Sequence, residues 1–271
     1  MGRDDFKNKK RIVVKVGTTT LTHANGHANL QRIDKLCRVL SDINNMGKDV
    51  ILVTSGAMGV GMGRLKIAAR PSATAERQAI AAVGQCELMQ IYSKTFSEYG
   101  HIVGQILLTR DVVDYDSSRA NAVNAFETLL RMGIIPIVNE NDTVSTEELE
   151  SNHNRGFGDN DKLSAIVASL VSADILFIMT DKDGFYDDNP DKNPDATLIG
   201  LVTEITPDLE RAAGGVGSSR GTGGMSAKLE AAKTAFSMGI DMVLINGSDP
   251  FILYDVLEGK EIGTFFQAPT V

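Results

Sequence analysis

Short apolar runs alternate with helical patterns along nearly the whole chain, and this alternation constrains the fold more than any other feature of the sequence. Six runs have the length and composition of buried strands: 11–16, 49–53, 101–108, 134–138, 175–179 and 241–245. They are largely apolar at successive positions, which is typical of strands covered on both faces. The sequence therefore predicts an α/β fold, an α/β/α three-layer sandwich with a mainly parallel central sheet.

Apolar residues between these strands recur at the spacing of amphipathic helices. The predicted helices cover 30–45, 73–99, 117–132, 161–171 and 225–238, and the second is either one helix or two joined near Gly84. No internal repeat or low-complexity linker interrupts the series. Residues 11–271 are therefore expected to form a single domain, after a polar and flexible tail over residues 1–10.

The composition excludes several classes of protein. The chain has 271 residues, 42% of them hydrophobic, and a net charge of −8, which disfavours a broad nucleic-acid surface because such a surface needs a basic stripe. No signal peptide and no membrane-spanning run is present, so a cytoplasmic location is expected. Cys37 and Cys86 form no CxxC motif and are interpreted as reduced thiols, and His23 and His27 lack a third metal ligand nearby.

Polar residues follow four of the predicted strands, at the point where each strand ends. These clusters lie at 17–18, 54–56, 139–142 and 180–181. In a parallel sheet the carboxyl ends of the strands share one edge, and ligands gather there. The alternative interpretation of Asn139 and Asp142 is plain turn chemistry. The four clusters in register predict a binding site at this edge.

A glycine-rich stretch with six glycines in 214–224 leads directly into the predicted helix 225–238. Glycines let the backbone approach a ligand closely, and the first N–H groups of a helix have no partner within the helix. Lys228 adds a cation one turn into that helix. The stretch therefore predicts a phosphate-binding site, with a flexible surface loop as the alternative.

Lys15 lies inside an apolar strand, where a lysine is costly unless its ammonium group reaches a partner or a cleft. The alternative is an edge lysine that reaches water. Lys15 and Lys228, far apart in the chain, together suit phosphoryl transfer, in which positive charge and positioning supply most of the catalysis. Asp161 is a carboxylate that could hold both lysines, although Asp159 and Asp161 also suit helix N-capping.

Common ligand-binding motifs are absent from the sequence. The two Gly-Lys pairs, at 47–48 and 259–260, are followed by acidic residues where a P-loop needs Ser or Thr. The stretch 59–63 resembles a dinucleotide fingerprint, but Arg64 stands where the third glycine should be. A calcium loop at 187–198 lacks its glycine and its final glutamate.

Six motifs closely resemble those of the amino acid kinase family, in order and in spacing. They are VVKVGT at 13–18, VTSGA at 53–57, NEND at 139–142, GDND at 158–161, TD at 180–181 and GTGGMSAK at 221–228. The resemblance extends from Arg11 to Phe266. Ala227 departs from the family pattern, in which a threonine usually precedes the lysine. Many relatives carry an additional C-terminal PUA domain, and here a single-domain form without it is expected.

The resemblance implies ATP-dependent phosphorylation of the γ-carboxylate of L-glutamate, the first step toward proline. It implies that Lys15 and Lys228 stabilise the transferring phosphoryl group and that Asp161 orients them. Glutamate is expected to bind Ser55, Asp142 and Asn160. ATP, together with Mg²⁺, is expected to bind Lys15, Thr180, Asp181, Thr222, Gly223, Gly224, Met225, Ser226, Ala227 and Lys228. No residue is assigned as a protein ligand of the metal.

The chemistry of the implied acceptor agrees with the residues present. A glutamate side chain has a pKa of about 4.3 and is already ionised at neutral pH, so no general base is needed. The acyl phosphate product is destroyed by water, and a closing lid is therefore expected from the glycine-rich stretch or from 152–158. The resemblance further implies a homo-oligomer and feedback inhibition by proline.

Other functions stay open at this point. Within the same family the acceptor could be acetylglutamate, aspartate or uridylate, the last being disfavoured because Ser55, Asp142 and Asn160 suit a zwitterion better than a nucleotide. A non-catalytic ATP-binding module is a second class. A Rossmann-like dehydrogenase is a third, and the incomplete glycine fingerprint argues against it.

Overall fold

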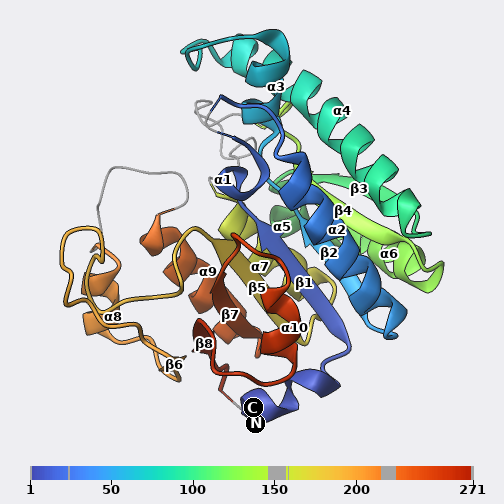
Figure 1. Cartoon of the computed structure of the whole chain (residues 1–271). Helices are drawn as coiled ribbons and strands as arrows, with labels where there is room; N and C mark the ends of the chain where they lie inside the picture. The colour runs from blue at the N-terminus through green and yellow to red at the C-terminus, as the bar shows by residue number, and fades with distance from the viewer. Residues whose placement is uncertain (1, 24, 146–156, 158, 215–223, 270–271) are drawn as a thin grey trace.

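The strands of the protein form one sheet with helices on both faces (Figure 1). A computed structural model describes residues 2–23, 25–145, 157, 159–214 and 224–269. In this part of the chain the sheet has eight strands in the order β3-β4-β2-β1-β5-β7-β8-β6. The strands are β1 (Arg11–Val16), β2 (Asp49–Val53), β3 (Val103–Leu108), β4 (Ile135–Glu140), β5 (Ile175–Thr180), β6 (Leu201–Val202), β7 (Asp241–Asn246) and β8 (Thr264–Phe266).

The sheet is parallel from β3 to β7, and β1 lies at its centre. Lys15 of β1 pairs with Val53 of β2 on one side and with Ile178 of β5 on the other. Only the pair β7–β8 is antiparallel among the described strands. The predicted three-layer, mainly parallel fold and its six strands are confirmed. The strands β6 and β8 were not predicted, because two or three residues are too few to show a pattern.

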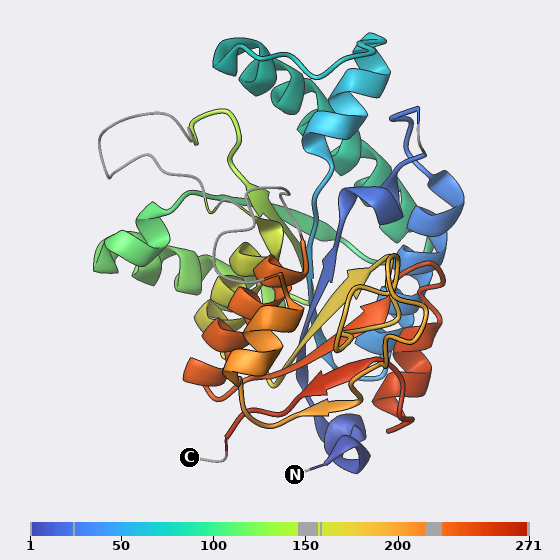
Figure 2. The same cartoon turned by 90° about the vertical axis from the view of Figure 1, so that its left-hand side faces the viewer.

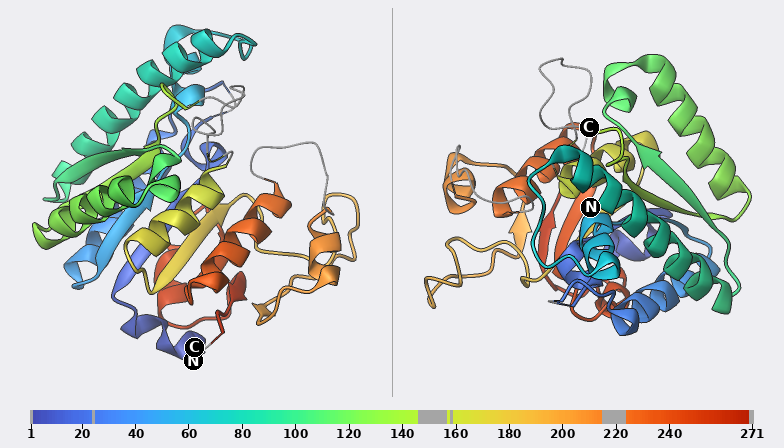
Figure 3. Two further views of the ribbon diagram at one scale, coloured as in Figure 1. Left: turned by 180° about the vertical axis from the view of Figure 1, so that it is seen from behind. Right: turned by 90° about the horizontal axis from the view of Figure 1, so that it is seen from above.

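The helices divide between the two faces of the sheet. They are α1 (Thr18–Leu21), α2 (Leu30–Asn45), α3 (Ala57–Leu65), α4 (Thr74–Glu98), α5 (Asp111–Asp114), α6 (Asp116–Arg131), α7 (Asn160–Leu170), α8 (Pro207–Ala212), α9 (Met225–Ser237) and α10 (Ile252–Leu257). Helices α2, α4 and α10 pack on one face (Figure 1), and α6, α7 and α9 pack on the other (Figure 3). None of the helices in the described residues is both long enough and apolar enough to cross a membrane.

The alternation of side chains along β1 decides where Lys15 points. Ile12, Val14 and Val16 belong to the apolar core beneath α2 and α4, whereas Val13 belongs to the core beneath α7 and α9. Successive side chains of a strand point to opposite faces. Lys15 therefore shares the face of Val13 and extends toward α7 and α9, where its ammonium group finds a partner.

Two glycines allow α3 and α4 to pack with their backbones in contact. A Cβ atom on Gly84 would lie 1.7 Å from the carbonyl oxygen of Ala57, and one on Gly61 would lie 2.1 Å from that of Ile80. Helix α4 runs without a break through Gly84, so the option of two helices joined there is wrong. The glycines at 59–63 lie in α3, where Gly61 faces α4, Gly59 faces Thr18 and Gly63 faces Gly26. Both helices project above the sheet (Figure 2).

The N-terminal segment is ordered against the end of the chain. Residues 3–8 form a 3-10 helix, η1 (Arg3–Asn8), and Phe6 is fully buried with its ring edge-on to Phe265 at 4.8 Å between centroids. The Arg3 guanidinium donates hydrogen bonds to the carbonyl oxygens of Ile262 and Gly200. Residues 3–8 are thus helical and packed through Phe6, within the segment 1–10 for which the sequence predicts a flexible tail. One buried aromatic ring anchors a segment whose composition is otherwise polar.

Candidate active site

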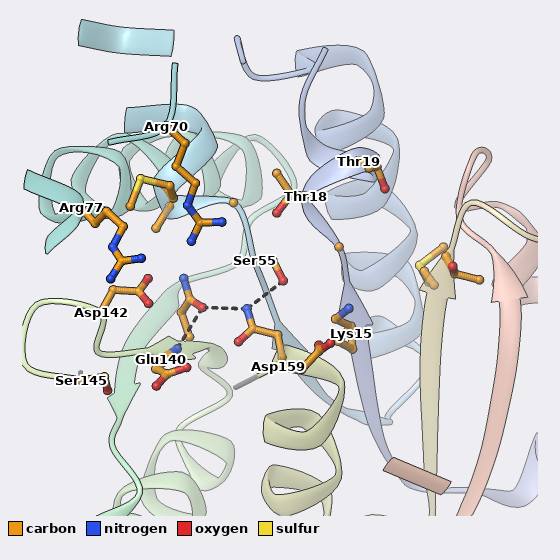
Figure 4. A pocket seen from close by; sticks show the side chains of 18 of the residues that line it. Lys15, Thr18, Thr19, Ser55, Arg70, Arg77, Glu140, Asp142, Ser145 and Asp159 are labelled. Atoms are coloured by element: carbon orange, nitrogen blue, oxygen red, sulfur yellow. Dashed lines mark hydrogen bonds between the residues drawn. The ribbon is translucent and has the colours of Figure 1, made fainter. Parts of the chain in front are cut away.

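A pocket of about 520 Å³ opens at the carboxyl edge of the parallel strands (Figure 4). Residues that line it come from β1, from the loop between β2 and α3, from α4, from the end of β4, from the start of α7, from β5 and from α9. The predicted site residues among these are Lys15, Ser55, Asp142, Asn160, Thr180, Asp181 and Lys228. The four polar clusters at the strand ends thus meet in one cavity, as the sequence predicts.

One end of the pocket is an ionic cluster built on Asp161. The Lys15 ammonium lies 2.5 Å from one carboxylate oxygen of Asp161, and the Lys228 ammonium donates to the other at 3.0 Å. The exposed fractions of Lys15, Asp161 and Lys228 are only 5%, 0% and 6%. The two lysines come from a central strand and from α9, so their convergence is a product of the fold. The predicted grouping of these three residues is confirmed.

Asp159 caps α7 and also belongs to the pocket wall. Its Oδ1 accepts a hydrogen bond from the backbone N–H of Asp161 at 2.8 Å, which satisfies one free donor of the helix start. Its Oδ2 is buried and has no hydrogen-bond partner within the described residues. Burial raises the pKa of the Asp159 carboxyl, and the nearby Asp161 carboxylate raises it further. Capping and a role in the site therefore coexist at the start of α7.

Beside the ionic cluster, neutral side chains form a second part of the pocket. The Asn160 amide donates to the Ser55 hydroxyl oxygen at 2.8 Å and to the Thr54 carbonyl at 3.0 Å. The same amide group lies 3.2 Å from Oδ1 of Asn139 (Figure 4). Ser55 precedes α3 and Asn160 begins α7, so the hydrogen bonds join two loops of the pocket edge. Two of the three predicted substrate-binding residues are thus in direct contact.

Charged residues that sequence reasoning missed face the third predicted substrate-binding residue, Asp142. In Figure 4 the Arg77 guanidinium points toward the Asp142 carboxylate, and Arg70 points into the cavity. Arg77 also donates to the hydroxyl of Thr74 at 3.1 Å. Both arginines lie in or just before the first turns of α4, outside every polar cluster at a strand end. No local sequence signal marks them, because only the packing of α4 on α3 brings them to the pocket.

The residues predicted to bind ATP lie around the ionic cluster, as far as they are described. Thr180 donates to the carboxylate of Asp181 at 3.1 Å, and both line the pocket. Gly224 is the N-cap of α9, whose first turn holds the next three predicted residues and then Lys228. The remaining predicted positions are outside the described residues: Thr222, Gly223, most of the glycine-rich stretch, and the lid candidate 152–158 apart from Phe157.

The described residues contain no group of three or more His, Cys, Asp or Glu side chains that could hold a metal ion. Magnesium in nucleotide sites usually takes phosphate oxygens, water and only one or two carboxylates. The unpartnered Oδ2 of Asp159 meets that smaller requirement. The pocket therefore suits a metal that arrives with a nucleotide.

Two buried ammonium groups are held by one carboxylate, next to the first turn of a helix at the edge of a parallel sheet, and this arrangement suits phosphoryl transfer. The model of the amino acid kinase family matches residues 10–246 of this chain. The chain therefore belongs to the amino acid kinase family.

Curated proteins similar to this chain are glutamate 5-kinases. The glutamate 5-kinase of Clostridium perfringens is 58% identical over 266 residues, which is 98% of each chain. That of Listeria monocytogenes serovar 1/2a is 56% identical, covering 98% of this chain and 96% of its own. That of Enterococcus faecalis is 53% identical, covering 97% of both.

Solved structures of more distant proteins share the fold. The product complex of T. acidophilum isopentenyl phosphate kinase has a TM-score of 0.63 at 18% identity, over 94% of this chain and 99% of its own. The UMP kinase of Bacillus anthracis has a TM-score of 0.63 at 16% identity, over 95% of each chain. At such identities the likeness concerns the fold alone, and it agrees with the predicted amino acid kinase architecture.

Proposed function

We propose that this protein is a glutamate 5-kinase, which transfers the terminal phosphoryl group of ATP to the γ-carboxylate of L-glutamate. The observation that carries the proposal is the convergence of Lys15 and Lys228 on Asp161, in the pocket that also holds Asp142 and Ser55. The high identity to curated glutamate 5-kinases over nearly the full chain supports the choice of acceptor. The product would be L-glutamyl 5-phosphate, the first intermediate toward proline.

Lys15 and Lys228 stabilise the phosphoryl group in the transition state of its transfer. In this step a carboxylate oxygen of glutamate forms a bond to the terminal phosphorus, the bond from that phosphorus to the bridging oxygen breaks, and ADP leaves. Negative charge is spread over the equatorial oxygens of the phosphoryl group. Because Asp161 holds both ammonium groups in the folded protein, little reorganisation is needed when that charge develops.

The acceptor needs no general base. A γ-carboxylate with an ordinary pKa of about 4.3 is ionised at neutral pH and attacks without losing a proton. None of the described residues that line the pocket is a histidine. The chain instead supplies groups that orient the acceptor: Ser55 and Asn160 are hydrogen-bonded to each other beside the ionic cluster.

The head group of glutamate binds at the far end of the pocket. The Asp142 carboxylate is suited to the substrate ammonium group. Arg70 points into the cavity nearby and carries the charge that a substrate α-carboxylate requires (Figure 4). A residue pair of opposite charge suits a zwitterion, whereas a nucleotide acceptor has no ammonium group for Asp142. This distinguishes glutamate from uridylate as the acceptor.

As a kinase the protein uses ATP as its phosphoryl donor, and Mg²⁺ belongs to the proposal. Bound Mg²⁺ would neutralise charge on the donor phosphates, with Asp159 as the carboxylate that has a spare oxygen. Thr180, Asp181 and the start of α9, together with Thr222 and Gly223, are proposed to bind the nucleotide. A homo-oligomeric state, a cytoplasmic location, a single-domain chain and feedback inhibition by proline stay predictions.

An assay of the purified protein tests the proposal. With ATP, Mg²⁺ and L-glutamate the protein should release ADP, and hydroxylamine should trap γ-glutamyl hydroxamate. L-aspartate, N-acetylglutamate and UMP serve as parallel acceptors. ADP release that depends on one of these and not on glutamate would overturn the choice of acceptor. Nucleotide binding without any acceptor-dependent turnover would instead favour a non-catalytic ATP-binding module.

A further inference from the structure

Gln85 lies behind the pocket wall and is joined to it by a chain of hydrogen bonds. It sits in α4 next to Gly84, is 9% exposed, and is not among the residues that line the cavity. Its side-chain oxygen accepts a hydrogen bond from Nδ2 of Asn139 at 2.8 Å. Its own Nε2 is buried without a partner in the described part of the chain. A buried amide nitrogen left in this way costs stability, and such a group needs an explanation.

The backbone fixes the orientation of the Asn139 amide. The main-chain N–H of Glu140 donates to Oδ1 of Asn139 at 2.9 Å, and a main-chain N–H can only donate. Oδ1 therefore faces Glu140, and Nδ2 faces α4. Gln85 must meet that donor with its oxygen, since a turned amide would place two N–H groups against each other. The unpartnered Nε2 of Gln85 is the result of this constraint.

A second backbone group fixes the amide of Asn160. The carbonyl of Thr54 can only accept, so the atom 3.0 Å from it is Nδ2 of Asn160. The same nitrogen approaches Oδ1 of Asn139 at 3.2 Å and the hydroxyl oxygen of Ser55 at 2.8 Å. Because Ser55 accepts here, its own hydroxyl hydrogen is available to a ligand in the pocket.

We propose that Gln85 is a positioning residue that holds the Asn139 amide, and through it Asn160, in place, so that Ser55 presents a hydrogen-bond donor to the carboxylate being phosphorylated. The inference rests on the proposed function and adds a residue to it. Gln85 accepts from Asn139, Asn139 accepts in turn from Asn160, and the same Asn160 amide donates to Ser55. A hydroxyl donor aimed at a carboxylate oxygen holds the nucleophile in line with the phosphoryl donor.

Steady-state kinetics of four proteins test the proposal: the wild type, Gln85→Met, Gln85→Glu and Gln90→Met. Gln85→Met keeps the length of the side chain and removes the acceptor, and it should lower kcat/KM for glutamate about tenfold with KM for ATP changed less than about twofold. Gln85→Glu keeps an acceptor oxygen and should stay within about threefold of the wild type. Gln90→Met, on an exposed position of the same helix, should match the wild type.

A double-mutant cycle with Ser55 separates positioning from a structural role. If Gln85 acts through Ser55, then Gln85→Met should change kcat/KM less than about twofold in the Ser55→Ala background. Multiplying losses in the double variant would overturn the proposal, and so would an unchanged Gln85→Met enzyme. Should Gln85→Met not fold, Gln85→Glu decides: a loss as deep as that of Ser55→Ala also overturns the proposal.

The activity of the wild type separates a failure of the proposed function from a failure of the role proposed for Gln85. A wild-type protein without glutamate-dependent ADP release removes the proposed function. An active wild type whose Gln85 variants behave like Gln90→Met removes only the role of Gln85. Thermal unfolding of each variant, recorded alongside, shows whether a loss of activity accompanies a loss of fold.

Discussion

The two ends of the pocket are built on different physical principles. At the phosphoryl end, Lys15, Asp161 and Lys228 are charged, almost fully buried and in direct ionic contact. At the acceptor end, Ser55 and Asn160 are neutral, half-buried and joined by amide hydrogen bonds. The comparison teaches that charges needed in the transition state are fixed in advance by the fold, whereas groups that admit a substrate stay near water.

The elements behind the two ends account for this difference. The phosphoryl end is formed by the central strand β1 and by the helices α7 and α9. These two helices pack on the same face of the sheet. The acceptor end is formed by the loops after β2 and β4, by α4 and by Asn160, the first residue of α7. Removing one partner of a buried ion pair costs much stability, because the other charge is left buried and unpaired. Removing a half-exposed charged group costs much less stability.

Removal of one ammonium group should have the largest effect. Lys228→Met should lower kcat about a thousandfold, because a fixed charge at the transferring phosphoryl group is lost. Lys233→Met is the matched control, since Lys233 lies on the same helix and pairs with Glu210 and Glu230 near the surface. Steady-state kinetics with saturating ATP check the prediction. An effect on KM for ATP alone would assign Lys228 to binding rather than to transition-state stabilisation.

Removal of a cation at the acceptor end should change binding rather than turnover. Arg70→Met should raise KM for glutamate about tenfold and leave kcat near the wild-type value, because the contact to the α-carboxylate is present before and during the reaction. Arg64→Met is the control, as Arg64 faces Glu87 at 3.6 Å on the outside of α3. A comparable rise in KM for ATP would contradict the separation of the two ends.

The ionisation of Asp159 should change the stability of the protein, and this effect should be smaller than the two effects on activity. Burial and Asp161 raise the pKa of this carboxyl in the folded state above its ordinary value of 3.8. The folded state then binds more protons than the unfolded state, so this contribution to stability is complete below pH 3.8 and is lost as the pH rises through the folded-state pKa.

Asp159→Asn keeps a good N-cap residue on α7. Because asparagine is uncharged, the variant does not lose stability as the pH rises through the pKa of Asp159. Its melting temperature should therefore exceed that of the wild type by a few degrees at pH 8, and the difference should shrink toward pH 4. Thermal unfolding followed by circular dichroism across this range checks the prediction. A difference that does not depend on pH would show that the Asp159 charge is not the cause. Activity should fall in the same variant, which would show that this end of the pocket gives up stability for function.

Much of the phosphoryl end could be predicted from the sequence, because its residues carry strong local signals. A lysine in an apolar strand is costly without a partner, and this marked Lys15. Asp161 was identified as a carboxylate that could hold both lysines, within the GDND motif of the family. The bounds predicted for β1, β2 and α2 agree with the structure. Here local pattern and tertiary structure give the same answer.

The acceptor end was harder to predict because tertiary packing creates most of it. Arg70 and Arg77 lie in no motif, and their side chains reach the pocket only because α4 lies against α3. Gln85 sits in a helix among ordinary residues, and its partner Asn139 is far along the chain. Phe6 was hidden in a charged segment for a similar reason, since its partner Phe265 is almost at the other end of the sequence.

The contact between the glycine backbones of α3 and α4 has a mechanical consequence. With no side chain between them at Gly61 and Gly84, the two helices pack backbone against backbone, so a movement of one helix would displace the other. Ser55 lies just before α3, and Gln85 lies in α4. Binding of another molecule to the outer surface of α4 would therefore also shift Ser55 and the proposed glutamate site.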